Sequence, residues 1–252
     1  MTSGTSTITV VTDPAGQVAA LLLAAENRIN DPSAPVADLR AAARDQQVQY
    51  RALVDHPEWL DRVIAAASDA VKPAIRANVA AGRRLRELSP PKRPTPPEGW
   101  HIVSPAPATE LLGYYKAAES EFGAPWPYLA AVHFVETRMG RIRGASSAGA
   151  LGPMQFLPKT WAAYGEGDIN SNRDSIRAAA RYLARNGAPA AMRNALWNYN
   201  HSYLYVDAVT AYAEQMRANE RAYFAYYHWQ VYYRTTNGDV LLPEGYGNGN
   251  EK

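Results

Sequence analysis

The sequence predicts a mostly α-helical protein with a small β-hairpin near its C-terminus. Three observations lead to this fold class: apolar residues recur at helical spacing along most of the chain, capping residues bound those segments, and an Asn-Gly dipeptide separates two strand-like runs near the end. With 252 residues, of which 47% are hydrophobic, the chain can bury a sizeable core as one large domain or two small ones.

An N-terminal helical region, residues 1–88, is expected to start with a capped helix. The Ser- and Thr-rich residues 1–12 are expected to lie outside it. Asp13 offers a side-chain acceptor to the free N–H groups of a helix start, and Pro14 fixes the first turn. A helix is therefore predicted from Pro14 to the Asn-Asp-Pro stop at residues 30–32.

Two more helical segments are expected in this region. Ser33 is expected to cap the first, which runs to about His56 because apolar residues such as Val36 follow at helical spacing. The second begins near Pro57, and Pro73 is expected to kink or restart it before Leu88.

A proline-rich linker, residues 89–106, follows the helical region. Residues 89–100 contain five prolines, which cannot continue a helix, so we expect a stiff and extended connector. We therefore place the domain boundary here, with the second domain covering residues 107–252.

The second domain is expected to open with two amphipathic helices. The first spans residues 107–122 and is followed by Gly123, and the second begins at Pro127 and ends at Gly140. The Gly- and Ser-rich residues 141–153 are expected to be irregular. Further helices are expected at residues 157–164, 173–186, 189–200 and 202–218.

The hairpin is expected around Asn237-Gly238. This dipeptide best fits a two-residue type I′ turn, which needs positive φ at both positions. The runs WQVYYRTT and DVLLP on its two sides are rich in β-branched, aromatic and other apolar residues, so they are read as the two strands.

Composition excludes several classes of function. The net charge is only +2, so no nucleic-acid partner is expected. The chain has no Cys, which excludes disulfides, thiolate metal sites and a cysteine nucleophile. The five His lack ligand spacing, and the loop starting at Asp168 departs from a calcium-binding loop at Arg173 and Ala179, so neither a metal ion nor another cofactor is expected.

Glu136 is a lone acid in the apolar stretch VHFVETRMG. A carboxyl group beside Phe134, Val135 and Met139 loses hydration when it ionises, which raises its pKa and lets it hold a proton for a leaving group. That is what the general acid of a glycosidase requires. The spacing alone favours the other interpretation, a solvent-exposed residue on a helix.

Three blocks in order, ETRMG, SSAGALGPMQFLPKTW and ALWNYNHSYLYV, resemble the lytic transglycosylases of the soluble and membrane-bound B types, which have a goose-lysozyme-like fold. In that family, Glu-Ser or Glu-Thr is followed by Ser-x-x-Gly-Ala-x-Gly-x-x-Gln and later by Tyr-Asn. The counterparts here are Glu136-Thr137, residues 146–155 and Tyr199-Asn200. The resemblance covers roughly residues 107–215. It implies a lysozyme-like helical domain that cleaves the β-1,4 bond between N-acetylmuramic acid and N-acetylglucosamine in peptidoglycan, forming a 1,6-anhydromuramoyl end.

The resemblance implies a role for each matching residue. Glu136 would act alone, first as acid and then as base, because the acetamido group of the sugar can replace a protein nucleophile. Ser146 and Asn200 would hold the carboxyl and acetamido groups, and Tyr199 would donate to the acid or stack on a sugar ring. Gln155 would bind the neighbouring sugar. The full set of implied substrate-binding residues is Thr137, Ser146, Met154, Gln155, Phe156, Tyr199 and Asn200, with Met154 and Phe156 as an apolar floor.

Plainer interpretations of these residues stay open. Ser146 in a Gly-rich loop is more often a turn residue, and Tyr199 alone is more often part of a core. A muramidase would hydrolyse the same bond if Asp168, Asp174 or Asp207 placed a water molecule. A non-catalytic peptidoglycan-binding protein would need no acid at all.

Peptidoglycan glycan strands are the expected partner. Arg141 and Arg143 are the candidates to meet the carboxylates of peptide stems. Residues 14–88 would pack on the catalytic domain, restrict its groove or dock to a cell-wall protein partner, and their Ala-rich faces favour packing. The expected location is the bacterial cell envelope or the medium. The apolar run at residues 18–25 is no convincing signal peptide, so an export signal or anchor is expected outside this sequence.

Overall fold

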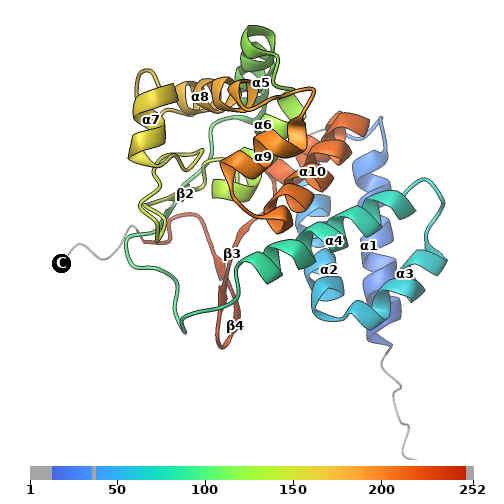
Figure 1. The fold of residues 1–252 in the computed structure, drawn as a ribbon. Helices are drawn as coiled ribbons and strands as arrows, with labels where there is room; N and C mark the ends of the chain where they lie inside the picture. The colour runs from blue at the N-terminus through green and yellow to red at the C-terminus, as the bar shows by residue number, and fades with distance from the viewer. Residues whose placement is uncertain (1–12, 36–37, 248–252) are drawn as a thin grey trace, which may run out of the picture.

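The computed structural model describes residues 13–35 and 38–247 of the chain (Figure 1). Helices make up 61% of the described residues, so the predicted mostly α-helical class is confirmed. The expectations for residues 1–12 and for Val36 lie outside the described residues. Over the described ranges, no helix is both long and apolar enough to cross a membrane.

The N-terminal region folds largely as expected. Asp13 caps the first helix, because its side chain accepts the N–H of Gly16 at 3.0 Å, and Pro73 lies in the first turn of the last helix. The expectation that Ser33 caps the second helix is wrong. Ala34 precedes a proline, which disfavours the helical conformation at that position, and the helix begins at Leu39. The elements of this region are α1 (Pro14–Asn30), α2 (Leu39–Asp55), the 3₁₀ turn η2 (Pro57–Trp59), α3 (Leu60–Ala66) and α4 (Lys72–Leu88).

The helices after the linker include one that the sequence pattern missed. Asn219 ends one helix and starts the next, since its side chain accepts the N–H of Arg221 at 2.9 Å, and the short helix α11 follows. The expected end of α6 at Gly140 is also wrong, because α6 stops at Thr137 and Arg138 takes the left-handed conformation itself. These helices are α5 (Ala108–Phe122), α6 (Trp126–Thr137), α7 (Pro158–Tyr164), α8 (Asn172–Arg185), α9 (Met192–Tyr199), α10 (Tyr203–Ala218) and α11 (Glu220–Tyr227).

Two small antiparallel sheets complete the described fold. Strand β1 (His101–Ile102) pairs with β2 (Ile142–Arg143), so the stretch expected to be irregular contains a short strand that binds the end of the linker. Strands β3 (Val231–Thr235) and β4 (Gly238–Leu242) form the predicted hairpin. The predicted type I′ turn is wrong, because it requires a positive φ at both residues. Within the Asn-Gly pair, only Gly238 has a positive φ, at 114°.

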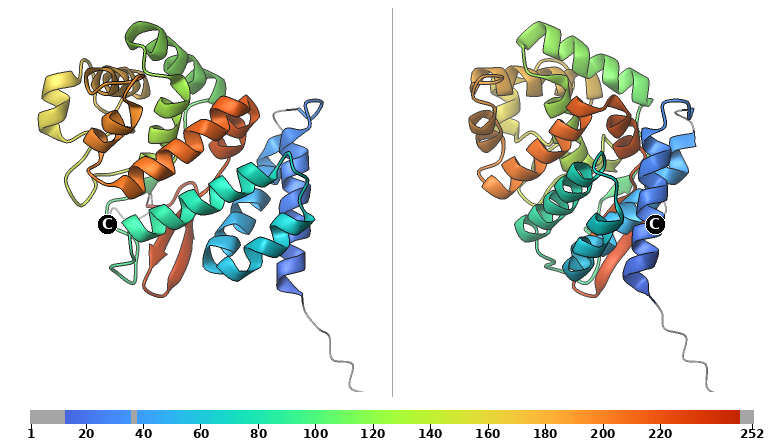
Figure 2. Two further views of the ribbon diagram at one scale, coloured as in Figure 1. Left: turned by 45° about the vertical axis from the view of Figure 1, so that its right-hand side comes forward. Right: turned by 90° about the vertical axis from the view of Figure 1, so that its right-hand side faces the viewer.

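Helix α10 lies at the centre of the molecule, against α4 on one side and α6 on the other (Figures 1 and 2). The main hydrophobic core is continuous across the linker. It includes fully buried residues from both regions: Leu22, Leu39, Leu53, Ile75, Leu129, Phe134 and Val209. The proline-rich linker therefore divides the sequence, but this core is shared, and the N-terminal helices pack on the rest of the protein.

Candidate active site

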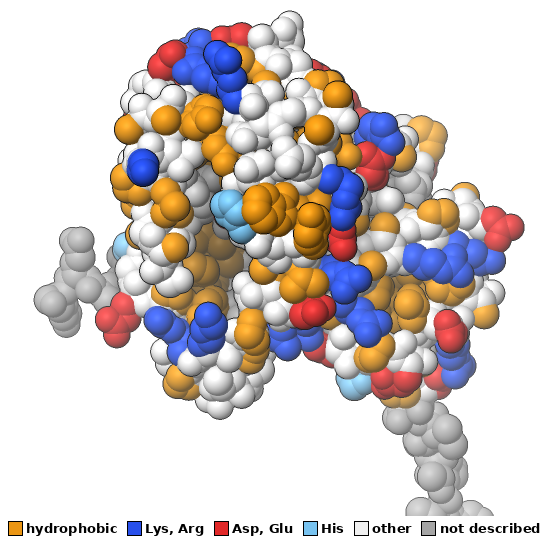
Figure 3. Space-filling model, viewed as in Figure 1, with side chains coloured by type: hydrophobic (Ala, Val, Ile, Leu, Met, Phe, Trp, Pro, Cys, Tyr) orange, Lys and Arg blue, Asp and Glu red, His pale blue; other side chains and the backbone are white. Residues whose placement is uncertain are grey.

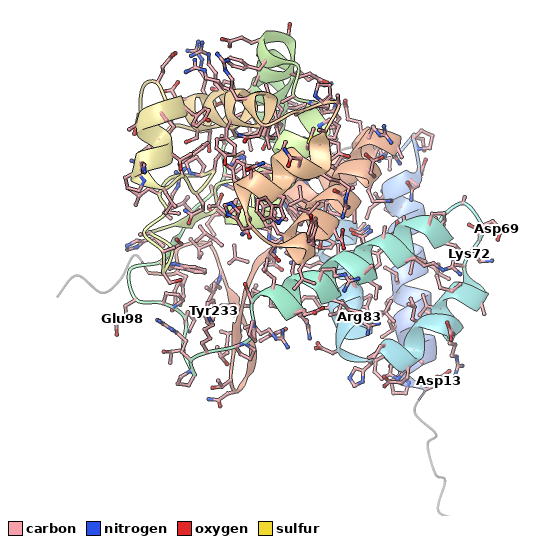
Figure 4. All side chains as sticks on the ribbon, in the orientation of Figure 1. Asp13, Asp69, Lys72, Arg83, Glu98 and Tyr233 are labelled. Carbon is pink, nitrogen blue, oxygen red and sulfur yellow. The ribbon has the colours of Figure 1, made fainter. Side chains whose placement is uncertain are left out.

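A cavity of about 660 Å³ opens between the N-terminal helices and the second part of the chain. Its walls come from α2, α4, the linker, the end of α6, the loop at residues 145–147, α10 and the hairpin. Figure 3 shows a hollow with an apolar floor and with Lys and Arg side chains at its lower edge. At the hairpin, Tyr233 lies beside the linker (Figure 4), and its ring meets Trp100 edge-on with centroids 5.5 Å apart. Glu136 lines this same cavity.

Glu136 is partly buried in the last turn of α6 and lines the cavity. Its Oε1 accepts a hydrogen bond from the hydroxyl of Tyr205 at 2.7 Å. Burial raises the pKa of Glu136 to about 7, although the hydrogen bond from Tyr205 acts in the opposite direction. The predicted rise in pKa is thus supported, and the carboxyl can be either protonated or charged near neutral pH.

The chain turns sharply directly after Glu136. Arg138 and Met139 both have positive φ, 53° and 58°, a conformation that is rare for residues other than glycine and costs about 1–3 kcal/mol each. Thr137 holds this turn: its hydroxyl donates to the carbonyl of Pro153 at 2.5 Å and accepts the N–H of Gly140 at 3.0 Å. Thr137 is fully buried and does not line the cavity, so its expected contact with substrate is replaced by a positioning role.

The loop of the second sequence block presents one predicted residue to the cavity. Ser146 lines it, and its hydroxyl oxygen accepts the N–H groups of Ala148 at 3.3 Å and Ala150 at 3.0 Å. Gln155 does not line the cavity. Its φ is 52°, and its side-chain amide donates to the carbonyl of Gly152 at 2.9 Å, so it holds its own loop.

Met154 and Phe156, which were expected to form an apolar floor for the substrate, belong to the hydrophobic core instead. Met154 is fully buried and Phe156 is only 3% exposed, and neither lines the cavity. Tyr199 donates its hydroxyl to the carbonyl of Met154 at 2.7 Å, so it does not bind Glu136. Its ring instead stacks on Tyr205, with an interplanar angle of 4° and centroids 6.4 Å apart.

Tyr205 belongs to the candidate site but was not predicted from the sequence. It lies in the third block, six residues after Tyr199, and Ser202 marks the start of its helix. Of the eight predicted residues, the cavity brings together Glu136, Ser146 and Asn200. Only the fold could reveal that Tyr205 in α10 faces the end of α6.

The carboxylates that line the cavity, among the described residues, are Glu136 and Asp239. Asp239 forms ion pairs with Arg51 and, at 3.2 Å, with Arg86. The aspartates considered for a muramidase lie elsewhere: Asp168, Asp174 and Asp207. Glu136 is therefore the lining carboxylate that has no basic partner within ion-pair distance among the described residues.

The cavity wall is rich in cations, but they are not the predicted ones. Arg141 and Arg143 are absent from the lining, and Arg143 donates to the carbonyl of Asn170 at 3.3 Å. The lining cations come from the N-terminal helices, the linker, the turn after α6 and the hairpin: Arg51, Arg86, Lys92, Arg93, Arg138 and Arg234. Arg51 and Arg86 are paired with Asp239, so the other four supply the positive charge of this wall.

Comparison of the chain with protein-family models, with curated proteins and with solved structures gives no match in any of the three. Within the described ranges, no cluster of three or more His, Asp and Glu residues could hold a metal ion.

Proposed function

We propose that this protein is a peptidoglycan lytic transglycosylase with a lysozyme-like catalytic domain. The observation that carries the proposal is the state of Glu136. It is a carboxyl group at a cavity, has its pKa raised to about 7 by burial, and is held by the hydroxyl of Tyr205. A group that is easily protonated and deprotonated at neutral pH suits a reaction in which one residue serves as acid and then as base.

In the first step, protonated Glu136 gives its proton to the glycosidic oxygen, and the bond from that oxygen to C1 of N-acetylmuramic acid breaks. The carbonyl oxygen of the sugar's own acetamido group attacks C1 and takes the place of a protein nucleophile. In the second step, the Glu136 carboxylate removes the proton from the C6 hydroxyl. The C6 oxygen then displaces the acetamido oxygen from C1, which closes the 1,6-anhydro ring and consumes no water.

The residues that line the cavity indicate which parts of the substrate each wall would bind. Ser146, Ser147 and Asn200 line the same cavity as Glu136 with neutral polar groups, where sugar hydroxyl and acetamido groups would bind. The cations of the N-terminal helices, linker and hairpin would face the carboxylates of peptide stems. The N-terminal helices pack on the rest of the protein and form part of the cavity wall. Because peptidoglycan lies outside the cytoplasmic membrane, the proposal includes a bacterial envelope or secreted location.

Two rival functions make different predictions. A muramidase needs a second carboxylate to activate water, and Asp239 is the remaining candidate, although two arginines already bind it. A non-catalytic peptidoglycan-binding protein gives no product. The position of Glu136 beside Tyr205, with the left-handed turn that follows, favours an active site over a plain binding surface.

The test is mass spectrometry of the muropeptides that the protein releases from purified sacculi. The wild type should release anhydro products, which are lighter by one water than the products of hydrolysis. Glu136→Gln should release none, whereas Glu98→Gln, at an exposed position on the linker (Figure 4), should act like the wild type. Hydrolysed products would instead identify a muramidase, and equal release by the wild type and Glu136→Gln would refute the proposal.

A further inference from the structure

A second, smaller pocket is lined by residues of β1, β3 and β4, of the segment after α6 and of α2. Its volume is about 210 Å³, and none of its lining residues lines the larger cavity. A small apolar cluster of Ile102, Val231 and Leu242 forms part of its wall, and Trp100 and Tyr233 of the larger cavity pack against the same cluster. The two hollows are therefore separate sites.

Basic side chains converge on this pocket from three parts of the chain. Arg40 and Arg44 lie four residues apart near the start of α2, so they share one face of that helix. Arg141 comes from the segment after α6, and His228 directly follows α11. Burial, together with the charges of Arg40, Arg141 and Arg44, lowers the pKa of His228 to about 4.

Arg141 has an unmet need for an acceptor. Its Nη1 is buried and has no hydrogen-bond partner among the described residues, while its guanidinium carbon lies 5.1 Å from the centroid of the Tyr227 ring. Unpaired buried donors are costly, above all when they are charged. None of the three arginines has an ion pair within the described ranges, and the carboxylate that lines the pocket is Glu244, to which Ser104 donates its hydroxyl. The pocket therefore carries a net positive charge, which a bound anion would neutralise.

We propose that this pocket binds a phosphate group. Three arginines and one glutamate leave two positive charges, which match a phosphate dianion better than a single carboxylate. Planar guanidinium groups from two directions, with His228 and Gln230 beside them, suit an acceptor with several oxygens. Free phosphate and the phosphate of a larger ester share this chemistry.

Calorimetric titration of the full chain with inorganic phosphate, at low ionic strength and mildly alkaline pH, tests the proposal. The wild type should bind, and the variant Arg44→Gln should bind about tenfold or more weakly, since it loses a charge-assisted contact. The matched control is Arg83→Gln, because Arg83 is an exposed arginine on α4 that lines neither pocket (Figure 4). Both variants change exposed side chains, so both should fold.

Two further ligands complete the experiment. Acetate should bind much more weakly than phosphate. Glycerol 3-phosphate that binds as well as phosphate would assign the pocket to phosphate esters, whereas its failure would restrict the pocket to the free ion. The absence of phosphate binding to the wild type, equal affinity in Arg44→Gln and Arg83→Gln, or equal affinity for acetate would each overturn the proposal.

Discussion

The hydrogen bond from Tyr205 to Glu136 should set the pH range of the proposed transglycosylase activity. The hydroxyl stabilises the charged carboxylate, so it lowers a pKa that burial has raised to about 7. Replacing Tyr205 with Phe removes the donor and keeps the ring, which is only 1% exposed and stacks on Tyr199. The pKa of Glu136 should therefore rise in Tyr205→Phe.

The size of this shift follows from the strength of the bond. A hydrogen bond to a charged group is worth about 1.5–3 kcal/mol, and one pKa unit corresponds to about 1.4 kcal/mol. Because Glu136 is partly exposed and screened by solvent, the lower end applies, which gives a rise of about one unit. The general acid must be protonated, so the rate falls as the pH rises through its pKa. That alkaline limb, near pH 7 in the wild type, should move to higher pH in Tyr205→Phe.

The assay is the release of soluble muropeptides from sacculi over a series of pH values. Tyr199→Phe is the matched control, because it removes a hydroxyl that binds the carbonyl of Met154 and not the acid. Its alkaline limb should stay in place. If the two variants have the same limb, or if that of Tyr205→Phe moves to lower pH, the role given to Tyr205 is wrong.

Three further substitutions have expected outcomes. In the folded state the pKa of Glu136 is raised from 4.5 to about 7, so the free energy of unfolding falls as the pH rises through this window. Glu136→Gln should remove this loss and stabilise the protein above pH 7 by at most about 3 kcal/mol, with no such gain below pH 4.5. Denaturant titrations at both pH values measure the difference. Thr137→Val should lower the free energy of unfolding by about 1–3 kcal/mol and lower activity, because the turn after Glu136 loses two hydrogen bonds. Thr137→Ser should retain both stability and activity. Unchanged unfolding of the Val variant would contradict this role. Gly152→Ala should destabilise the folded state by more than about 1 kcal/mol and so lower the melting temperature. The reason is that φ at this position is 73° and the added Cβ would lie 2.0 Å from the carbonyl oxygen of Ile169.

Local sequence signals predicted most of the helices. Asp13 and Pro14 mark the start of α1, and Gly123 closes α5 with a φ of 75°, because caps and glycine act within one turn of the chain. The end of α6 could not be predicted in the same way. Gly140 is the usual stop signal, but tertiary contacts of Thr137 force the turn at an arginine. Helix α11 was missed because its cap, Asn219, directly ends the preceding helix.

The candidate site could be predicted only in part, because tertiary packing decides which residues face the cavity. The apolar neighbours of Glu136 in the sequence indicated a raised pKa, which depends mainly on burial. The motif could not say which of its residues face the cavity. Met154 and Gln155 are neighbours in the sequence, yet one is buried in the core and the other binds its own loop. The cations from α2 and α4 are far from Glu136 in the sequence, and only the packing of these helices brings them to it.

The shared core has a practical consequence for dissecting the protein. A fragment that begins at residue 107 would contain all three motif blocks, but it would lose α2 and α4 and with them one side of the cavity. It would also expose to water the face of α10 that α4 covers. Truncation at the linker should therefore yield an aggregating polypeptide instead of a minimal enzyme, and the two halves need to be produced as one chain.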